Sequence, residues 1–167
     1  MTTRTLVLVR HAHAVPHASG GDRARPLSAA GLDQARALGR TLSGVLPGVD
    51  EAVCSTAVRT VQTLEALADS IDVASRWRDD ALYLCDADDL LADARAFDDD
   101  VRVAMLVAHE PSISWAAGLL ASDGPSAALV AMGVPTATAV VARFAGRWRD
   151  LTEGGCSLET YHESRRS

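Results

Sequence analysis

The sequence contains no lysine, so arginine supplies all 16 of its Lys and Arg residues. Acidic residues outnumber them at 22, which gives a formal net charge of −6 at pH 7. Proteins that bind nucleic acids neutralise phosphates with a basic surface, and this composition lacks the necessary excess of positive charge. We therefore predict no nucleic-acid partner, and any anion site must rely on arginine as its strong side-chain cation.

Long apolar runs and a cysteine framework are also missing. No apolar stretch approaches the roughly 20 residues that span a bilayer, and the run Leu6–Val9 is too short for the core of a signal peptide. The three cysteines, Cys54, Cys85 and Cys156, are odd in number and widely spaced, unlike a disulfide framework or a zinc site. These features predict a cytoplasmic protein with reduced cysteines and no membrane contact.

The 167 residues and 48% hydrophobic content suit one globular domain over residues 1–167, with a flexible polar tail at 153–167. Apolar patterns predict strands at 6–9, 51–55, 71–74 and 103–108, helices at 29–45, 58–67, 87–97 and 111–122, and a closing hairpin of 136–144 with 147–151. This alternation predicts an α/β fold with three layers, in which helices cover both faces of a mainly parallel central sheet.

Polar residues follow three of the predicted strands. Arg10 and His11 come directly after the first, a turn from Ser55 to Arg59 follows the second, and His109 follows the strand at 103–108. Ser55 or Thr56 is suited to cap the helix in which Arg59 lies. The carboxyl ends of parallel strands meet at one edge of a sheet, where open α/β folds bind ligands, so these residues are expected to converge there.

The expected cluster of arginines indicates a phosphate-like ligand. Arg10 and Arg59, with Arg25 at the end of a glycine-containing loop, would repel one another unless an anion lay between them. Neighbouring arginines would also lower the pKa of His11 from about 6.5, which leaves one ring nitrogen free to attack phosphorus. His109 would then stabilise charge on the phosphoryl oxygens.

Four ordered motifs resemble those of one enzyme family. Val9-Arg10-His11-Ala12 is similar to an RHG signature, with alanine in place of glycine, and Arg25-Pro-Leu-Ser-Ala-Ala-Gly31 to a motif that starts a helix. The segments 55–63 and 107–111 resemble its arginine-containing and second-histidine motifs. With these motifs the sequence resembles the histidine phosphatase (phosphoglycerate-mutase-like) superfamily, and most closely its SixA-type phosphohistidine phosphatases. The resemblance covers roughly residues 4 to 145.

The resemblance implies a phosphoglycerate-mutase-like fold and a phosphohistidine intermediate on His11. It implies a phosphate pocket of Arg10, Arg59 and His109, with Arg25 as a further phosphate contact, and it implies neither a metal nor an organic cofactor. The substrate it favours is phosphohistidine in a protein, such as a histidine phosphotransfer domain. A phosphatase for small phosphate monoesters and a non-catalytic phosphate-binding module are the alternatives.

The proton donor and the rim of the site stay open at this point. Glu110 and Asp80 are the two candidates for a general acid. His13 is expected at the rim, where it could contact substrate. The pair His11 and His13 could also hold a metal, but neighbouring arginines would repel a cation. If Ala12 had to adopt a positive φ angle, it would be strained where the family has glycine.

Overall fold

The computed structural model describes residues 1–122 and 130–162. Its strands are β1 (Thr3–Arg10), β2 (Val49–Ser55), β3 (Val73–Asp79), β4 (Val103–Ala108), β5 (Thr138–Ala145) and β6 (Ser157–His162). Its α-helices are α1 (Ala29–Ser43), α2 (Val58–Leu67), α3 (Ala87–Arg95) and α4 (Ser112–Leu120), with short 3-10 helices η1 (Asp22–Ala24), η2 (Asp80–Tyr83) and η3 (Trp148–Asp150).

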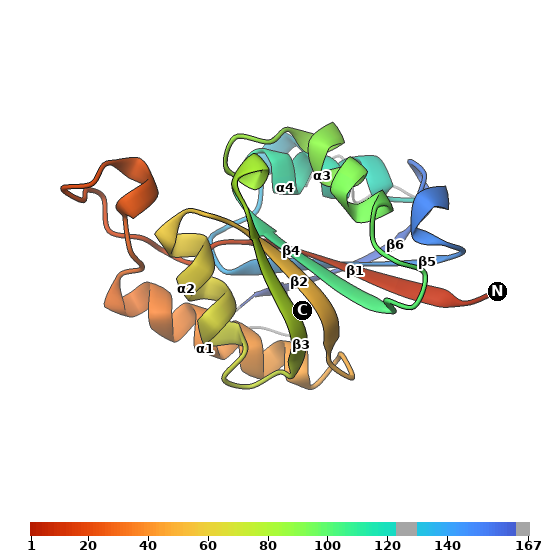
Figure 1. The fold of residues 1–167 in the computed structure, drawn as a ribbon, viewed down its shortest axis with the longest axis horizontal. Coiled ribbons are helices and arrows are strands. Elements are labelled where there is room, and N and C mark those ends of the chain that lie inside the picture. The colour runs from red at the N-terminus through yellow and green to blue at the C-terminus, as the bar shows by residue number, and fades with distance from the viewer. Residues whose placement is uncertain (123–129, 163–167) are drawn as a thin grey trace.

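The six strands form one sheet in the order β3-β2-β4-β1-β5-β6. The first three neighbouring pairs are parallel, and β5 and β6 add two antiparallel pairs at the other side. Helices α1 and α2 cover one face and α3 and α4 the other (Figure 1). The predicted mainly parallel α/β sheet with helices on both faces is confirmed.

Strand β1 divides the core into two halves. Leu6 and Leu8 pack with residues of α3 and α4, whereas Val7 and Val9 pack with residues of α1 and α2. All four side chains are fully buried, because successive residues of a strand point to opposite faces. Strand β1 is therefore fixed from both sides, which gives His11, directly after it, a rigid support.

The structure corrects three predictions. The predicted hairpin partner at 147–151 is wrong: β5 pairs with β6 at Ser157–His162, so part of the predicted polar tail belongs to the sheet, while residues 163–167 of that tail lie outside the described residues. Strand β3 starts at Val73 and runs to Asp79, beyond the predicted end. Helix α2 has Ala57 at its N-cap with no side-chain hydrogen bond, so neither Ser55 nor Thr56 caps it.

Helix α1 begins as predicted, with Ser28 Oγ accepting a hydrogen bond from the Gly31 amide. Gly31 lies against the segment that follows β1. A Cβ atom there would be 1.9 Å from the backbone oxygen of His13. The close approach of α1 to this segment therefore requires glycine at position 31.

We expect Gly31→Ala to destabilise the protein by about 1–3 kcal/mol, because backbone atoms must move apart to admit the methyl group. The free energy of unfolding in urea measures this effect. Gly44→Ala is the matched control, since its nearest neighbour, the Thr41 oxygen, would lie 3.4 Å from the new Cβ atom. Equal stability of Gly31→Ala and wild type would contradict the expected clash.

Candidate active site

The candidate site lies at the carboxyl ends of β1, β2 and β4, as the sequence predicts. His11 follows β1, Ser55 ends β2 and His109 follows β4. The rings of His11 and His109 have their centroids 5.2 Å apart. Both histidines are 9% exposed, so they lie beneath the surface and still reach solvent on one side.

Arg59, in the first turn of α2, connects the two histidines. Its Nε donates to His11 Nε2 at 3.3 Å, and its Nη2 donates to His109 Nδ1 at 3.3 Å. The guanidinium is almost completely enclosed, since Arg59 is 5% exposed. One buried cation thus holds both rings in fixed orientations.

These contacts define the tautomers of both rings. A guanidinium can only donate, so His11 Nε2 and His109 Nδ1 must each accept with a lone pair. The other nitrogens then carry the protons: His11 Nδ1 donates to the Ala12 oxygen at 2.7 Å, and His109 Nε2 donates to Ser55 Oγ at 2.9 Å. The unprotonated nitrogen of His11 therefore faces the arginine.

Burial and positive neighbours keep both histidines neutral. The pKa of His11 is lowered from 6.5 to about 4, chiefly by burial and also by Arg59, Arg10 and Arg25, against a raising contribution from the hydrogen bond to the Ala12 oxygen. Burial also lowers the pKa of His109, to about 3, with His11 and Arg59 as further causes. The sequence correctly predicts the direction of the His11 shift, but desolvation outweighs the arginines as its cause.

We expect the ring-proton NMR signals of His11 and His109 to titrate near pH 4 and pH 3, well below the usual 6.5. The unfolded chain binds protons at higher pH than the folded one, so stability falls as the pH drops from about 6.5 to 4. His11 alone contributes roughly 3 kcal/mol to this loss. Unfolding free energies at pH 7 and 4.5 measure it, and His109→Gln should show a smaller difference between them. A midpoint near 6.5 for either ring would contradict this assignment.

Arg10 approaches the site from the end of β1. Its Nη1 donates to the Val134 oxygen at 2.7 Å, and its buried Nε has no hydrogen-bond partner among residues 1–122 and 130–162. A buried donor without a partner is costly unless a ligand satisfies it. This donor is therefore suited to a phosphoryl oxygen.

Ala12 fits without strain. Among the described residues other than glycine, only Ala137 has a positive φ angle. The buried Ala12 amide donates to Thr63 Oγ1 at 3.0 Å. Alanine at this position therefore leaves the local backbone conformation intact.

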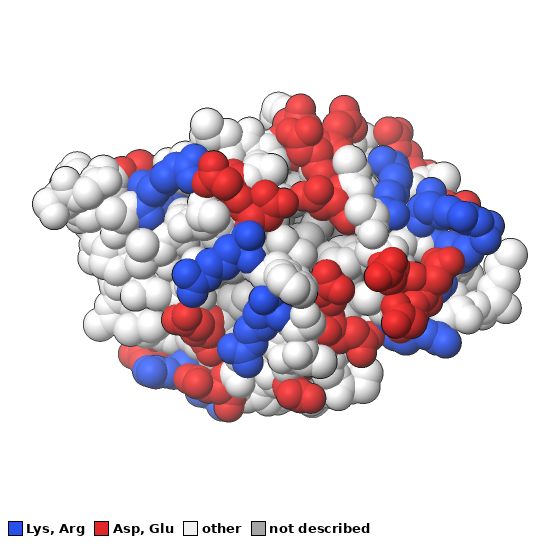
Figure 2. Space-filling view, in the orientation of Figure 1, with Lys and Arg blue, Asp and Glu red and all other residues white. Residues whose placement is uncertain are grey.

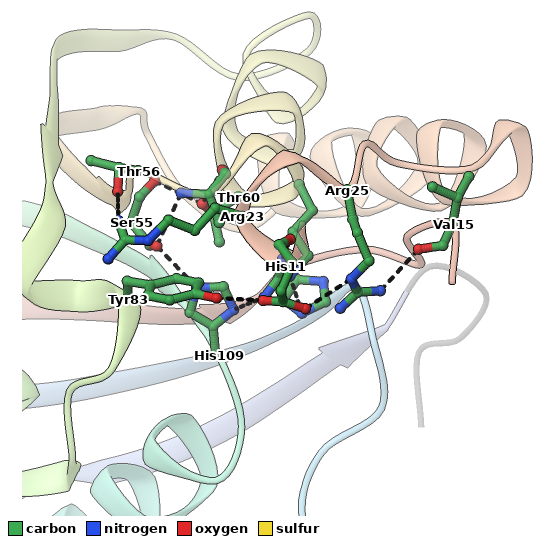
Figure 3. Close-up of polar contacts among 12 residues, drawn as sticks. His11, Val15, Arg23, Arg25, Ser55, Thr56, Thr60, Tyr83 and His109 are labelled. Atoms are coloured by element: carbon green, nitrogen blue, oxygen red, sulfur yellow. Dashed lines mark hydrogen bonds and ion pairs between the residues drawn. The ribbon is translucent and has the colours of Figure 1, made fainter. Parts of the chain in front are cut away.

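Two residues that the sequence analysis does not identify complete the cluster. Asp22, in η1, accepts hydrogen bonds from Arg59 Nη2 at 3.0 Å and from Arg25 Nε at 2.9 Å. Tyr83, in η2, donates to the Asp22 carboxylate at 2.5 Å and packs edge-on against His109 (Figure 3). Asp22 precedes Arg25 by three residues, and this spacing is a weak indication in the sequence that the two side chains pair. Nothing in the sequence around Tyr83 indicates its contacts.

The structure does not bring the remaining candidates into this cluster. Glu110 accepts hydrogen bonds from Ser114 and from the Val134 amide, so it joins the start of α4 to a neighbouring loop. Asp80 is fully engaged by Arg23 and Thr56, and hydrogen bonds from both lower its pKa. His13 is exposed at the rim and bonds to Ser28 Oγ at 2.8 Å.

Residues 1–122 and 130–162 contain no group of three or more His, Cys, Asp or Glu side chains placed to hold a metal ion. Within the same ranges, every helix is too short or too polar to cross a bilayer.

Known proteins resemble this chain in sequence and in structure. The family model of the histidine phosphatase superfamily (branch 1) matches residues 6–82. An uncharacterized protein of Mycobacterium tuberculosis is 34% identical over 161 residues, which cover 94% of this chain and 100% of the relative. One of Mycobacterium leprae is 31% identical over 147 residues, covering 86% of this chain and 89% of the relative.

Solved structures extend the likeness. A candidate phosphohistidine phosphatase SixA from Nakamurella multipartitia has a TM-score of 0.84 and 35% identity, with 97% of each chain covered. The protein histidine phosphatase SixA complexed with tungstate has a TM-score of 0.73 at 20% identity, covering 95% of this chain and 97% of the other, which shows the shared fold alone. The chain belongs to the histidine phosphatase superfamily, and within it to the SixA type.

Proposed function

We propose that this protein hydrolyses phosphohistidine on a protein substrate, through a covalent phosphohistidine intermediate at His11 Nε2. The observation that carries the proposal is the 3.3 Å hydrogen bond from Arg59 Nε to this nitrogen. The bond requires a lone pair on His11 Nε2 and places a buried cation beside it. A neutral nucleophile next to a phosphate-binding cation is the arrangement that phosphoryl transfer needs.

The reaction has two displacements at phosphorus. The lone pair of His11 Nε2 forms a bond to phosphorus as the bond to the substrate imidazole breaks, and the departing ring keeps that electron pair and takes a proton from solvent. Water then attacks phosphorus, the bond from phosphorus to His11 Nε2 breaks with its electron pair returning to the ring, and inorganic phosphate leaves as the proton of the water passes to solvent. Arg10, Arg25 and Arg59 stabilise negative charge on the phosphoryl oxygens in both steps, while His109, whose N–H donates to Ser55, holds Arg59 in position.

The surroundings of the acidic residues support phosphohistidine as the substrate class. Among the described residues, Glu110 and Asp80 are held by hydrogen bonds outside the cluster. The pKa of Asp22 lies far below its usual range, because Tyr83, Arg25 and Arg59 donate hydrogen bonds to it. Hydrogen bonds lower the pKa of both Asp22 and Asp80, which keeps these two carboxyl groups ionised at neutral pH and unsuited to donate a proton. A leaving alkoxide requires a proton donor, whereas a leaving imidazole requires much less help.

The surface near the site supports a protein substrate. Leu84, directly after Tyr83, and Met132, two residues before Val134, are each 85% exposed. Both side chains are apolar surface that a docked protein substrate would cover. Acidic side chains gather over α3, whose first turn contains Asp88 and Asp89 (Figure 2). A partner with apolar and basic residues around its phosphohistidine would complement this surface.

The test is phosphate release from a phosphorylated histidine-containing phosphotransfer domain, beside a panel of sugar, nucleotide and aryl phosphate esters. We expect the phosphoprotein to be dephosphorylated with a kcat/KM at least about 100-fold above that for any ester, which corresponds to about 2.7 kcal/mol of preferential transition-state binding. Turnover of esters alone would make the protein a small-molecule phosphatase. Phosphate binding without any turnover would make it a binding module.

A further inference from the structure

The Asp22 carboxylate lies among the groups that would bind a phosphoryl group. One oxygen accepts from Arg59 Nη2 at 3.0 Å and from the Tyr83 hydroxyl at 2.5 Å, and the other accepts from Arg25 Nε at 2.9 Å. Figure 3 shows Tyr83 and Arg25 on opposite sides of His11. Two arginines and a phenol thus surround one anion that belongs to the chain itself.

The Asp22 carboxylate and the nucleophile His11 accept hydrogen bonds from the same arginine, Arg59. Arg59 donates through Nε to His11, through Nη2 to His109 and Asp22, and through Nη1 to the Asp22 backbone oxygen at 2.8 Å. Every nitrogen of the guanidinium therefore has an acceptor. Attack by His11 Nε2 uses the lone pair that accepts from Arg59 Nε and so frees that donor, whereas Nη2 becomes available to a phosphoryl oxygen when Asp22 gives way.

The segment that carries Asp22 can yield this position without loss of core packing. Helix η1 contains no buried residue, and the Asp22 side chain is 52% exposed. Gly21, just before it, has a φ angle of 83°, a conformation that glycine adopts without steric strain. The loop can turn the carboxylate toward solvent while β1, α1 and α2 stay in place.

We propose that Asp22 is an internal competitor of the phosphoryl group: its carboxylate occupies Arg59 and Arg25 between turnovers, yields to the substrate and returns as inorganic phosphate leaves. The inference rests on the proposed function, since it assumes that Arg59 binds the phosphoryl group. A dianion with three oxygens interacts more strongly with two arginines than a carboxylate does, so the substrate can displace Asp22. The returning carboxylate then favours release of the product.

The test is the dissociation constant of inorganic phosphate at pH 7.5, measured by calorimetry for wild type, Asp22→Asn and Asp22→Ala. We expect both variants to bind phosphate about tenfold more tightly, because the ligand no longer displaces a charged hydrogen bond. Asp69→Asn is the matched control: it also removes a carboxylate paired with an arginine, Arg36, and should leave the dissociation constant unchanged. Melting temperatures confirm that each variant is folded.

A direct contact and a long-range charge effect differ in their response to salt. At 1 M salt the Debye length is about 3 Å, so a long-range effect of the lost charge would disappear while the gain from a vacated contact persists. Weaker or unchanged phosphate binding in both variants would show that Asp22 holds Arg59 in position, and would overturn the proposal. Arg59→Ala separates the two hypotheses: if it binds phosphate as well as wild type does, the proposed phosphate site itself is wrong.

Discussion

Replacing His11 by alanine is expected to reduce turnover of the phosphoprotein by a factor on the order of 10⁴ to 10⁶, comparable with the loss of a nucleophile in other covalent enzymes. His11 Nε2 carries its lone pair beside Arg59 Nε, whereas His109 Nδ1, the other unprotonated nitrogen, accepts from Arg59 Nη2 at a different position and so does not replace the nucleophile. The wild type should also form a phosphoenzyme that ³¹P NMR detects at alkaline pH. The variant should form none.

The matched control is His162→Gln, which changes a histidine in the edge strand β6 that bonds to Thr138 and lies outside the cluster. It should retain the activity and the phosphoenzyme of the wild type. Full turnover by a folded His11→Ala protein would rule out His11 as the nucleophile. A phosphoenzyme signal that persists in this variant would place the covalent bond on another residue.

Replacing Arg59 by lysine should lower kcat/KM by about 10²–10³, which is the usual effect of removing one donor that stabilises transition-state charge. Lysine keeps the positive charge but has a single nitrogen. It cannot bond to His11, His109 and a phosphoryl oxygen together, as the guanidinium does through separate nitrogens. Steady-state kinetics with the phosphoprotein measure the loss.

Arg36→Lys is the control for this change, because Arg36 lies on the exposed surface of α1 in an ion pair with Asp69. It should leave kcat/KM within about twofold of the wild type, as surface ion pairs contribute little. If Arg59→Lys retained full activity, positive charge alone would suffice, and the bridging geometry of the guanidinium would have no catalytic role.

The central strands could be predicted from sequence, and the edge strands less well. Buried β1 and β4 have continuous apolar runs that local patterns reveal. Strand β6 lacks such a run, because one side of an edge strand faces solvent, and its sequence Ser-Leu-Glu-Thr-Tyr-His has a weak pattern. Only pairing with β5, a tertiary contact, makes this segment a strand. Because this pairing is not visible in the local sequence, the segment 147–151 was the wrong partner for β5 in the predicted hairpin.

Some residues of the site could likewise be predicted from the sequence and others could not. Arg10, His11 and His109 stand directly after buried strands, so topology alone brings them together. Asp22, in η1, bonds to Arg59 across 37 residues of sequence and to Tyr83, in η2, across 61 residues. The sequence suggests Ser55 as a helix cap, whereas its hydroxyl bonds to His109. Side-chain polarity in a loop predicts exposure and gives no information on which distant group it contacts.

The position of β1 between β4 and β5 determines when the site can form during synthesis. This strand is made first, yet it pairs at residues 5–10 with residues 103–108 and at residues 3–10 with residues 138–145. The hydrogen bond from Arg10 Nη1 to the Val134 oxygen likewise joins residues 124 positions apart in the sequence. Contacts so distant in sequence slow folding. A nascent chain that has not yet released β5 from the ribosome therefore carries β1 with one edge unpaired and no assembled site, and an unpaired apolar strand edge favours aggregation.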